Sequence, residues 1–218
     1  MFRRLPLVPS VIAGALVAGG LLASSVAYAG ASKPESTRFS LFPTQKFLAC
    51  VSADSARPAR VSARVERGDD NDTMTLRLDG FKPDLAFDLF TVENTPQLAD
   101  GTANPDFKDN FGLAWYQSDI HVNGAGRGRV RVKTILLDQI FGFDKGVALP
   151  PTNTFNVGFW FNDPADAQAC GFTGSTPFNG EHKAGPLAFV TRLDATTHLG
   201  PLCTDPTTSP LGAVACNP

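Results

Sequence analysis

The sequence predicts an all-β fold: an antiparallel β-sandwich of immunoglobulin-like or related Greek-key type, disulfide-bonded and with long loops. Three observations favour this class. From Cys50 onward, apolar and polar residues alternate along short segments, which is the period of a half-buried strand. Glycine, proline, asparagine and aspartate interrupt these segments at short intervals. No long amphipathic helical pattern occurs, and strands with this spacing are typical of a sandwich.

The first predicted hairpin runs through residues 60–79, and its alternating apolar residues give it one buried face. A register that pairs Val65 with Met74 buries this face on both strands. A shift of the pairing by two residues would place Arg64 opposite Arg77, and like charges directly opposite each other destabilise a sheet. The sequence therefore predicts the register with Val65 opposite Met74.

The second predicted hairpin closes through the loop 124–126, whose glycines supply the positive φ that such loops need. Two neighbours on one face, Asp119 and His121, are candidate ligands or a base and its orienting group. Closing the hairpin sets Asp119 opposite Arg131 and His121 opposite Arg129. Cross-strand ion pairing on a solvated face therefore accounts for all of these residues without a functional site.

Three further strands and two short helices complete the predicted domain. The strands are predicted at residues 85–94, 154–161 and 185–193, and the helices at 136–141 and 164–169. The first of these strands is apolar on both faces, as expected for a central strand. The second helix has an aspartate at its N-cap position and proline at its first helical position.

The N-terminus has the features of a secretory signal peptide. Arg3 and Arg4 precede the uncharged run 11–22, and the small-x-small cleavage pattern follows at 27–29. The apolar run is shorter than the ~20 residues that span a bilayer. We therefore expect a secreted, extracellular protein, with the cell envelope as the alternative location. The adjacent arginines leave both the general and the twin-arginine export route open.

The remaining chain is long enough for one domain with its own core. No later apolar run approaches spanning length, so no membrane span is expected after signal removal. The predicted organisation is a signal peptide 1–29, an N-terminal linker 30–45, a β-sandwich domain 46–199 and a disulfide-clipped C-terminal tail 200–218.

The charge of the chain is mildly acidic. There are 19 basic and 21 acidic residues, and the first 29 residues hold two of the basic and none of the acidic ones. The sequence shows no Lys/Arg cluster, so no nucleic-acid partner is expected. The expected partner is an extracellular ligand or protein whose identity the sequence does not give.

Four cysteines, Cys50, Cys170, Cys203 and Cys216, lie in the part expected to be exported. An even number in an oxidising compartment predicts two disulfides, for which three pairings exist. We favour Cys203–Cys216, because it closes a local loop, and this leaves Cys50–Cys170 as the second bond. Zinc is the competing interpretation, but the sequence has no C-x-x-C pair.

A loop with an adjacent Glu181-His182 pair holds the best candidates for catalysis. With Asp163, these residues could serve as acid and base in a secreted hydrolase. Adjacent residues of an extended segment point in opposite directions, so only one of the pair can enter a given pocket. Asn179 and the following glycine instead suggest a turn. No G-x-S-x-G nucleophile motif is present.

No cofactor is expected, with calcium as the alternative. Calcium binds clustered oxygens, and the candidate ligands are Asp69, Asp70, Asp72 and Asp163. None of the acidic segments has the spacing of an EF-hand loop, and aspartate is common in turns for other reasons. The three histidines are too few for a copper/zinc dismutase-like site.

Aromatic residues give the last candidate site. The chain has 17 phenylalanines but two tryptophans, so the aromatic set is expected to form mainly a core. Trp115 and Trp160 fall on the face opposite the main apolar row of their strands and, with Asn179, are candidate ligand-binding residues. If these tryptophans are buried, they line a second layer instead. Loops 94–112 and 162–184 are the expected contact surface.

The function that the sequence favours is that of a secreted, non-enzymatic binding or interaction protein. The alternatives are the hydrolase with the Glu-His loop site and a calcium-stabilised protein of the cell surface or matrix.

Overall fold

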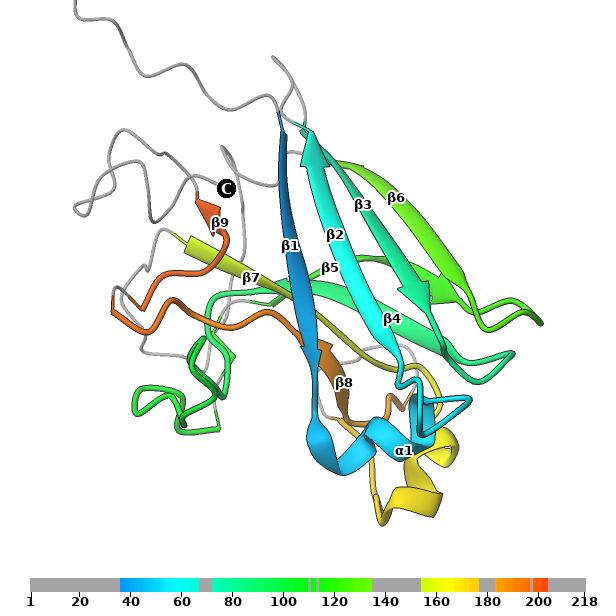
Figure 1. Cartoon of the computed structure of the whole chain (residues 1–218). Helices are drawn as coiled ribbons and strands as arrows, with labels where there is room; N and C mark the ends of the chain where they lie inside the picture. The colour runs from blue at the N-terminus through cyan, green and yellow to red at the C-terminus, as the bar shows by residue number, and fades with distance from the viewer. Residues whose placement is uncertain are drawn as a thin grey trace, which may run out of the picture. The chain divides into compact units, whose positions relative to one another are not determined.

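The computed structural model describes residues 36–66, 72–109, 111–112, 114–134, 154–176, 183–196 and 198–203. The chain divides after Gly30, and the described residues all belong to its second unit, Ala31–Pro218. Antiparallel strands make up most of the regular secondary structure among the described residues, and the helices are short (Figure 1). The predicted all-β class is therefore confirmed. None of the helices in the described ranges has the length and apolar character that crossing a bilayer requires.

The described strands follow one another along the chain with three short helices among them. The strands are β1 (Ser36–Pro43), β2 (Arg60–Glu66), β3 (Asp72–Asp79), β4 (Ala86–Val92), β5 (Ala114–His121), β6 (Gly128–Thr134), β7 (Thr154–Phe161), β8 (Leu187–Val190) and β9 (Leu202–Cys203). The helices are η1 (Gln45–Phe47), α1 (Leu48–Val51) and η2 (Pro164–Cys170). The predicted helix at 136–141 lies outside the described residues.

Strand β1 lies within residues 30–45, which are predicted to be a linker, and this prediction is wrong for Ser36–Pro43. Thr37, Phe39 and Leu41 alternate with exposed polar residues, and this short alternation gives the segment one inward face. Leu41 is buried in the core, and Phe39 packs against it. The ordered sheet therefore begins earlier in the chain than the sequence analysis placed it.

All described strands belong to one antiparallel sheet. The strand order is β5-β4-β7-β8-β1-β2-β3-β6, and β9 pairs with β7. The register of the first hairpin, with Val65 opposite Met74, is confirmed. So is the central position of β4, which lies between β5 and β7.

The sheet is barrel-like, which differs from the expected sandwich of separate layers. Ser36–Leu41 of β1 pair with β2, whereas Phe42 and Pro43 pair with β8, so β1 belongs to both halves. At the other end of the strand order, β5 and β6 are consecutive strands that meet at the bridge between Val122 and Gly128. Alternation in a sequence shows which side of a strand is buried, but not how the sheet closes.

The second hairpin is confirmed only at its turn. The amide N of Asn123 donates to the carbonyl of Arg127 at 2.8 Å, as the predicted closure requires. Beyond the bridge next to this turn, β5 pairs with β4 and β6 pairs with β3. The predicted ion pair of Asp119 with Arg131 is therefore not formed, and Asp119 instead accepts a hydrogen bond of 2.8 Å from the hydroxyl of Tyr116.

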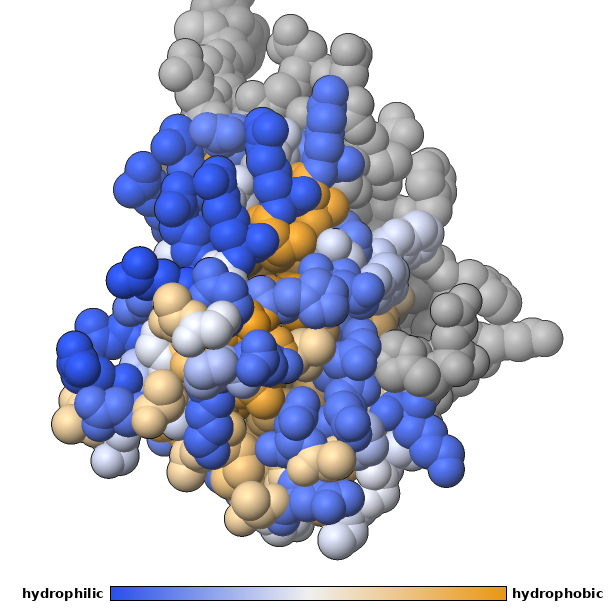
Figure 2. Space-filling model, turned by 90° about the vertical axis from the view of Figure 1, so that its right-hand side faces the viewer, coloured by the Kyte–Doolittle hydropathy of each residue, from blue (hydrophilic) through white to orange (hydrophobic). Residues whose placement is uncertain are grey.

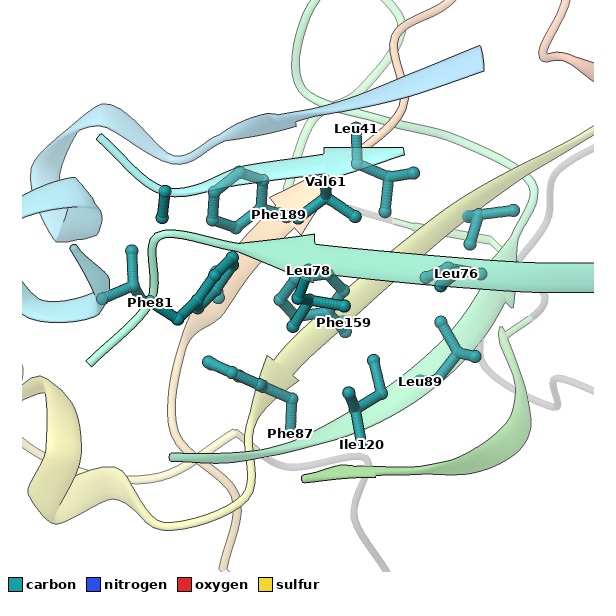
Figure 3. Packing of buried hydrophobic residues seen from close by; sticks show 14 of the residues in the cluster. Leu41, Val61, Leu76, Leu78, Phe81, Phe87, Leu89, Ile120, Phe159 and Phe189 are labelled. Atoms are coloured by element: carbon teal, nitrogen blue, oxygen red, sulfur yellow. The ribbon is translucent and has the colours of Figure 1, made fainter. Parts of the chain in front are cut away.

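Phenylalanine rings from several strands fill the interior of the sheet (Figure 3). The ring centroid of Phe159 on β7 lies 4.9 Å from that of Phe87 on β4 and 5.3 Å from that of Phe189 on β8. Phe81, which follows β3, packs 5.4 Å from Phe189. All four side chains are fully buried. The phenylalanine-rich composition therefore does serve the core, as predicted.

A disulfide joins Cys50 in α1 to Cys170 in η2, across 120 residues of sequence. This pairing confirms one of the two predicted bonds. Its presence is compatible with an exported protein, because disulfides persist in oxidising compartments. The second predicted bond includes Cys216, which lies outside the described residues, so Cys203–Cys216 stays a prediction.

Candidate anion-binding surface

Basic side chains gather on the outer face of β1, β2, β3 and β6. The inward residues of these strands are apolar, so the alternate, outward positions are exposed to solvent. We call these outward basic residues the basic face: Arg38, Arg60, Arg64, Arg77, Arg129, Arg131 and Lys133. Figure 2 looks onto the side that carries β6 and shows hydrophilic side chains over most of it, with a narrow hydrophobic strip between them.

Like charges lie directly opposite one another on the basic face. Arg38 of β1 pairs in register with Arg64 of β2. Arg77 of β3 pairs in register with Arg129 of β6. Arginines at directly opposed positions repel each other and lower the stability of a sheet. The arrangement is therefore not explained by the needs of folding.

Among the described residues of this face, carboxylates are few. Glu66 lies 3.2 Å from a guanidinium nitrogen of Arg64, and Asp79 lies 3.3 Å from Nε of Arg127. The first pair is nearly half exposed and the second is largely exposed to solvent, where an ion pair contributes little to stability. The face thus carries a clear excess of positive charge, although the whole chain has a formal net charge of −2.

The expectation that the protein has no Lys/Arg cluster is wrong for this surface. In the sequence the arginines stand apart, because each alternates with an inward apolar residue. The predicted hairpin also placed Arg129 and Arg131 opposite His121 and Asp119, which would have offset their charge. The structure instead places β6 beside β3, and Arg129 meets Arg77. The sequence signal that could have found the cluster is the outward position of arginine on all four strands, β1, β2, β3 and β6.

A pocket of about 310 Å³ lies at one end of the basic face. It is formed by the segment before β2, the end of β3 and the loop between β5 and β6. Its charged lining residues are Asp54, Arg57, Arg60, Asp79 and Arg127. Two ion pairs, Arg57–Asp54 and Arg127–Asp79, lie within this set.

The two tryptophans do not form a shared exposed patch. Trp160 is 1% exposed, and its ring centroid lies 5.4 Å from that of Phe90 and 5.1 Å from that of Phe111. It belongs to a second apolar cluster outside the main core, so the second-layer alternative applies to it. Trp115 is 40% exposed on β5 and stays the accessible member of the pair.

The predicted contact loop 94–112 is held partly by buried polar contacts. The side-chain amide of Asn104 donates to Oδ1 of Asn94 at 2.6 Å and to the carbonyl of Thr95 at 2.8 Å. Phe111 attaches the same loop to the second apolar cluster by its contact with Trp160. These residues therefore hold the loop in place.

Asp163, a candidate for both catalysis and calcium binding, has a structural role. It is the N-cap of η2, and its carboxylate accepts a hydrogen bond of 2.8 Å from the amide N of Ala165. The predicted cap is therefore confirmed. The other catalytic candidates, Glu181 and His182, and the binding candidate Asn179 lie outside the described residues.

The candidate calcium ligands at the β2–β3 turn are not brought together within the described residues. Asp72 lies at the start of β3 and is 3% exposed, whereas Asp69 and Asp70 fall outside the described ranges. In the part of the chain that the structure describes, no three side chains of His, Cys, Asp or Glu form a group that could hold a metal.

Asp166 provides a test of the electrostatics around η2. Burial raises the pKa of its carboxyl group above the ordinary value, and the nearby charge of Asp163 adds to this. A raised pKa in the folded state means that the ionised form is destabilising above this pKa. We expect Asp166→Asn to raise the free energy of unfolding at pH 7 by about 0.5 kcal/mol or less, because water screens a partly exposed group.

The increase in the free energy of unfolding that Asp166→Asn gives should become smaller as the pH falls through the pKa of Asp166. The wild-type carboxyl group is then protonated and resembles asparagine. Urea unfolding of both proteins at pH 7 and pH 3 measures this difference. An increase in the free energy of unfolding that is larger at pH 3 than at pH 7 would contradict the raised pKa of Asp166.

Comparisons with protein-family models, with curated proteins and with solved structures found no match for this chain. Fold and surface together define an all-β, disulfide-bonded protein with one basic sheet face. What this protein binds has therefore to be argued from its own residues.

Proposed function

We propose that this protein is an exported, non-enzymatic binding protein that holds an acidic polysaccharide on its basic face. The observation that carries the proposal is the pairing of like charges, Arg38 with Arg64 and Arg77 with Arg129, on one exposed sheet face. Such pairs lower stability in the free protein, and an anionic ligand would relieve their repulsion.

The chemistry of the face fits sulfate or carboxylate groups on a sugar chain. Arginine presents a planar fork of donors that binds carboxylate and similar oxyanions through two parallel hydrogen bonds. Ser40 of β1 pairs in register with Ser62 of β2, and Ser62 in turn lies opposite Arg77 of β3. Thr75 of β3 lies between Arg64 of β2 and Arg131 of β6. Their hydroxyl groups can both donate to and accept from the hydroxyls of a sugar.

Among the described outward positions of the four strands, one is aromatic: Phe42 at the end of β1, whose ring faces the guanidinium of Arg192. Binding of single-stranded nucleic acid uses a series of aromatic side chains on which successive bases stack, and a single ring already in contact with an arginine does not provide such a series. A polysaccharide is therefore favoured over a nucleic acid. Export and the disulfide agree with such a ligand, since acidic polysaccharides occur outside cells.

We assign the connections of the sheet to the Greek-key type as part of the same proposal. Strand β3 lies beside β6, and β4 lies beside β7, so the chain crosses between the two halves instead of adding strands in sequence order. The barrel-like closure favours this assignment over the immunoglobulin-like alternative. It also explains how arginines from distant segments reach one face.

The proposal predicts that Arg77→Gln/Arg129→Gln will weaken binding to dextran sulfate and polygalacturonate about tenfold or more, because charge-assisted hydrogen bonds are lost. The same change should leave the free energy of unfolding unchanged or raise it by a few tenths of a kcal/mol, since like-charge repulsion is relieved. Calorimetric titration at two salt concentrations measures the first effect, and urea unfolding measures the second. Binding by the wild type should weaken at the higher salt concentration.

A matched control is Lys82→Gln/Lys183→Gln, which removes two exposed cations outside the basic face. This variant should bind like the wild type, and uncharged dextran should not bind to either protein. Equal losses in the two double variants would mean that only net charge matters, and the proposed face would be abandoned. Duplex DNA that binds more tightly than both polysaccharides at equal salt would replace the polysaccharide with a nucleic acid.

A further inference from the structure

We infer that the pocket at the end of the basic face binds one uronic acid residue, the terminal sugar of the polysaccharide. The inference rests on the proposed function and adds to it the chemistry of the group that is bound. It concerns the pocket lined by Asp54, Arg57, Arg60, Asp79 and Arg127.

The walls of the pocket are tied together by backbone hydrogen bonds. The amide N of Ala53 donates to the carbonyl of Gly80 at 3.0 Å, and that of Phe81 donates to the carbonyl of Gly126 at 3.1 Å. Gly126 has a φ of +70°, and a Cβ atom there would lie 2.4 Å from the carbonyl oxygen of Phe81. The loop between β5 and β6 can therefore approach β3 this closely only with glycine, which fixes the shape of the pocket in the free protein.

The charges of the pocket are mixed. Asp54 pairs with Arg57 at 3.5 Å, and Asp79 pairs with Arg127 at 3.3 Å. Within the described residues no ion pair includes Arg60, which is exposed at the start of β2. Arg60 is thus the cation of the pocket that is left for a ligand.

A uronic acid matches this mixture better than a simple anion does. Its carboxylate can form two parallel hydrogen bonds with the guanidinium of Arg60. Its hydroxyls can donate to the carboxylates of Asp54 and Asp79 and accept from the neighbouring arginines. A sulfate ion would meet the two carboxylates at close range without a proton to donate, so like-charge repulsion disfavours it.

The size and position of the pocket point to a chain end. Its volume of about 310 Å³ is at the small end of ligand pockets, which suits a single sugar ring. Arg60 and Arg64 lie on the same side of β2, and Asp79 and Arg77 on the same side of β3. A polysaccharide that lies along the basic face can therefore place its last residue in the pocket.

The test uses small sugars with the full exported chain. We expect methyl glucuronide to bind the wild type in calorimetric or NMR titration, methyl glucoside not to bind, and Arg60→Gln to weaken methyl glucuronide binding about tenfold or more. Arg131→Gln is the matched control, because it removes an arginine of the basic face that does not line the pocket. It should leave methyl glucuronide binding unchanged and weaken only the polymer.

The outcomes separate this inference from the proposed function. A protein that binds polygalacturonate through Arg77 and Arg129 but does not bind methyl glucuronide would overturn the pocket inference alone. Sodium sulfate that competes with methyl glucuronide at equal concentration would also overturn it, since the pocket would then be a simple anion site. If no protein in the test, including the wild type, binds the polysaccharides, both proposals are wrong.

Discussion

Replacing Cys50 and Cys170 together by alanine is expected to lower the free energy of unfolding by about 4 to 5 kcal/mol. The bond closes a segment of 120 residues, and the loss of chain entropy that a crosslink imposes on the unfolded state grows with the length of the closed segment. It also ties α1 to η2 at the end of the sheet, where Phe47 packs against Phe161 and Phe172. Denaturant unfolding of the two proteins measures the difference.

Reduction of the disulfide is the control for this prediction. When both proteins also carry Cys203→Ala and Cys216→Ala, a reducing agent should move the midpoint of the protein with the Cys50–Cys170 bond towards that of the protein without it, and leave the latter unchanged. An equal midpoint for the oxidised wild type and the variant would show that the bond does not stabilise the fold.

Phe159→Ala is expected to lower the free energy of unfolding by about 3 to 5 kcal/mol, because truncating a buried ring leaves a cavity as well as removing its burial. Phe159 is completely buried, and its ring packs against Phe87 and Phe189 from the neighbouring strands. These rings link the two strands beside β7, so the cavity cannot close without moving strands. The measurement is urea unfolding followed by tryptophan fluorescence.

The control for the core prediction is Phe42→Ala, which truncates the same kind of side chain on the surface. Phe42 is 37% exposed, and its ring faces the guanidinium of Arg192 at 4.2 Å from the centroid. The expected loss is about 1 kcal/mol or less, the size of an exposed cation–π contact. Similar losses for the two variants would mean that Phe159 is not the centre of the core.

The sequence predicts the local structure of this protein well, because local rules decide it. Val65 pairs with Met74 because alternation fixes the buried face and because the shifted register would oppose Arg64 and Arg77. Asp163 caps η2 because an aspartate before a proline satisfies the first amide groups of a helix. Each of these predictions depends on residues that are close in the sequence or joined by one turn.

Contacts between distant strands could not be predicted in the same way. Every strand has two edges, and the sequence pattern predicts the partner of only one edge, the one that faces the strand joined to it by a turn. The rule against opposed like charges holds between β2 and β3 but fails at their outer edges, where Arg64 meets Arg38 and Arg77 meets Arg129. The candidate site lies at these edges, so its arginines are brought together only by pairings that the sequence pattern does not predict.

The place of β1 in the sheet has a consequence for biosynthesis. This strand is made first among those described, and it needs both β2, which follows soon after, and β8, which follows more than a hundred residues later. Its pairing cannot be completed on the ribosome until almost the whole described chain has emerged. Folds dominated by such distant pairings form slowly. A nascent chain that stays open for this long is in the state that the predicted signal peptide would require, since general export carries chains across the membrane before they fold.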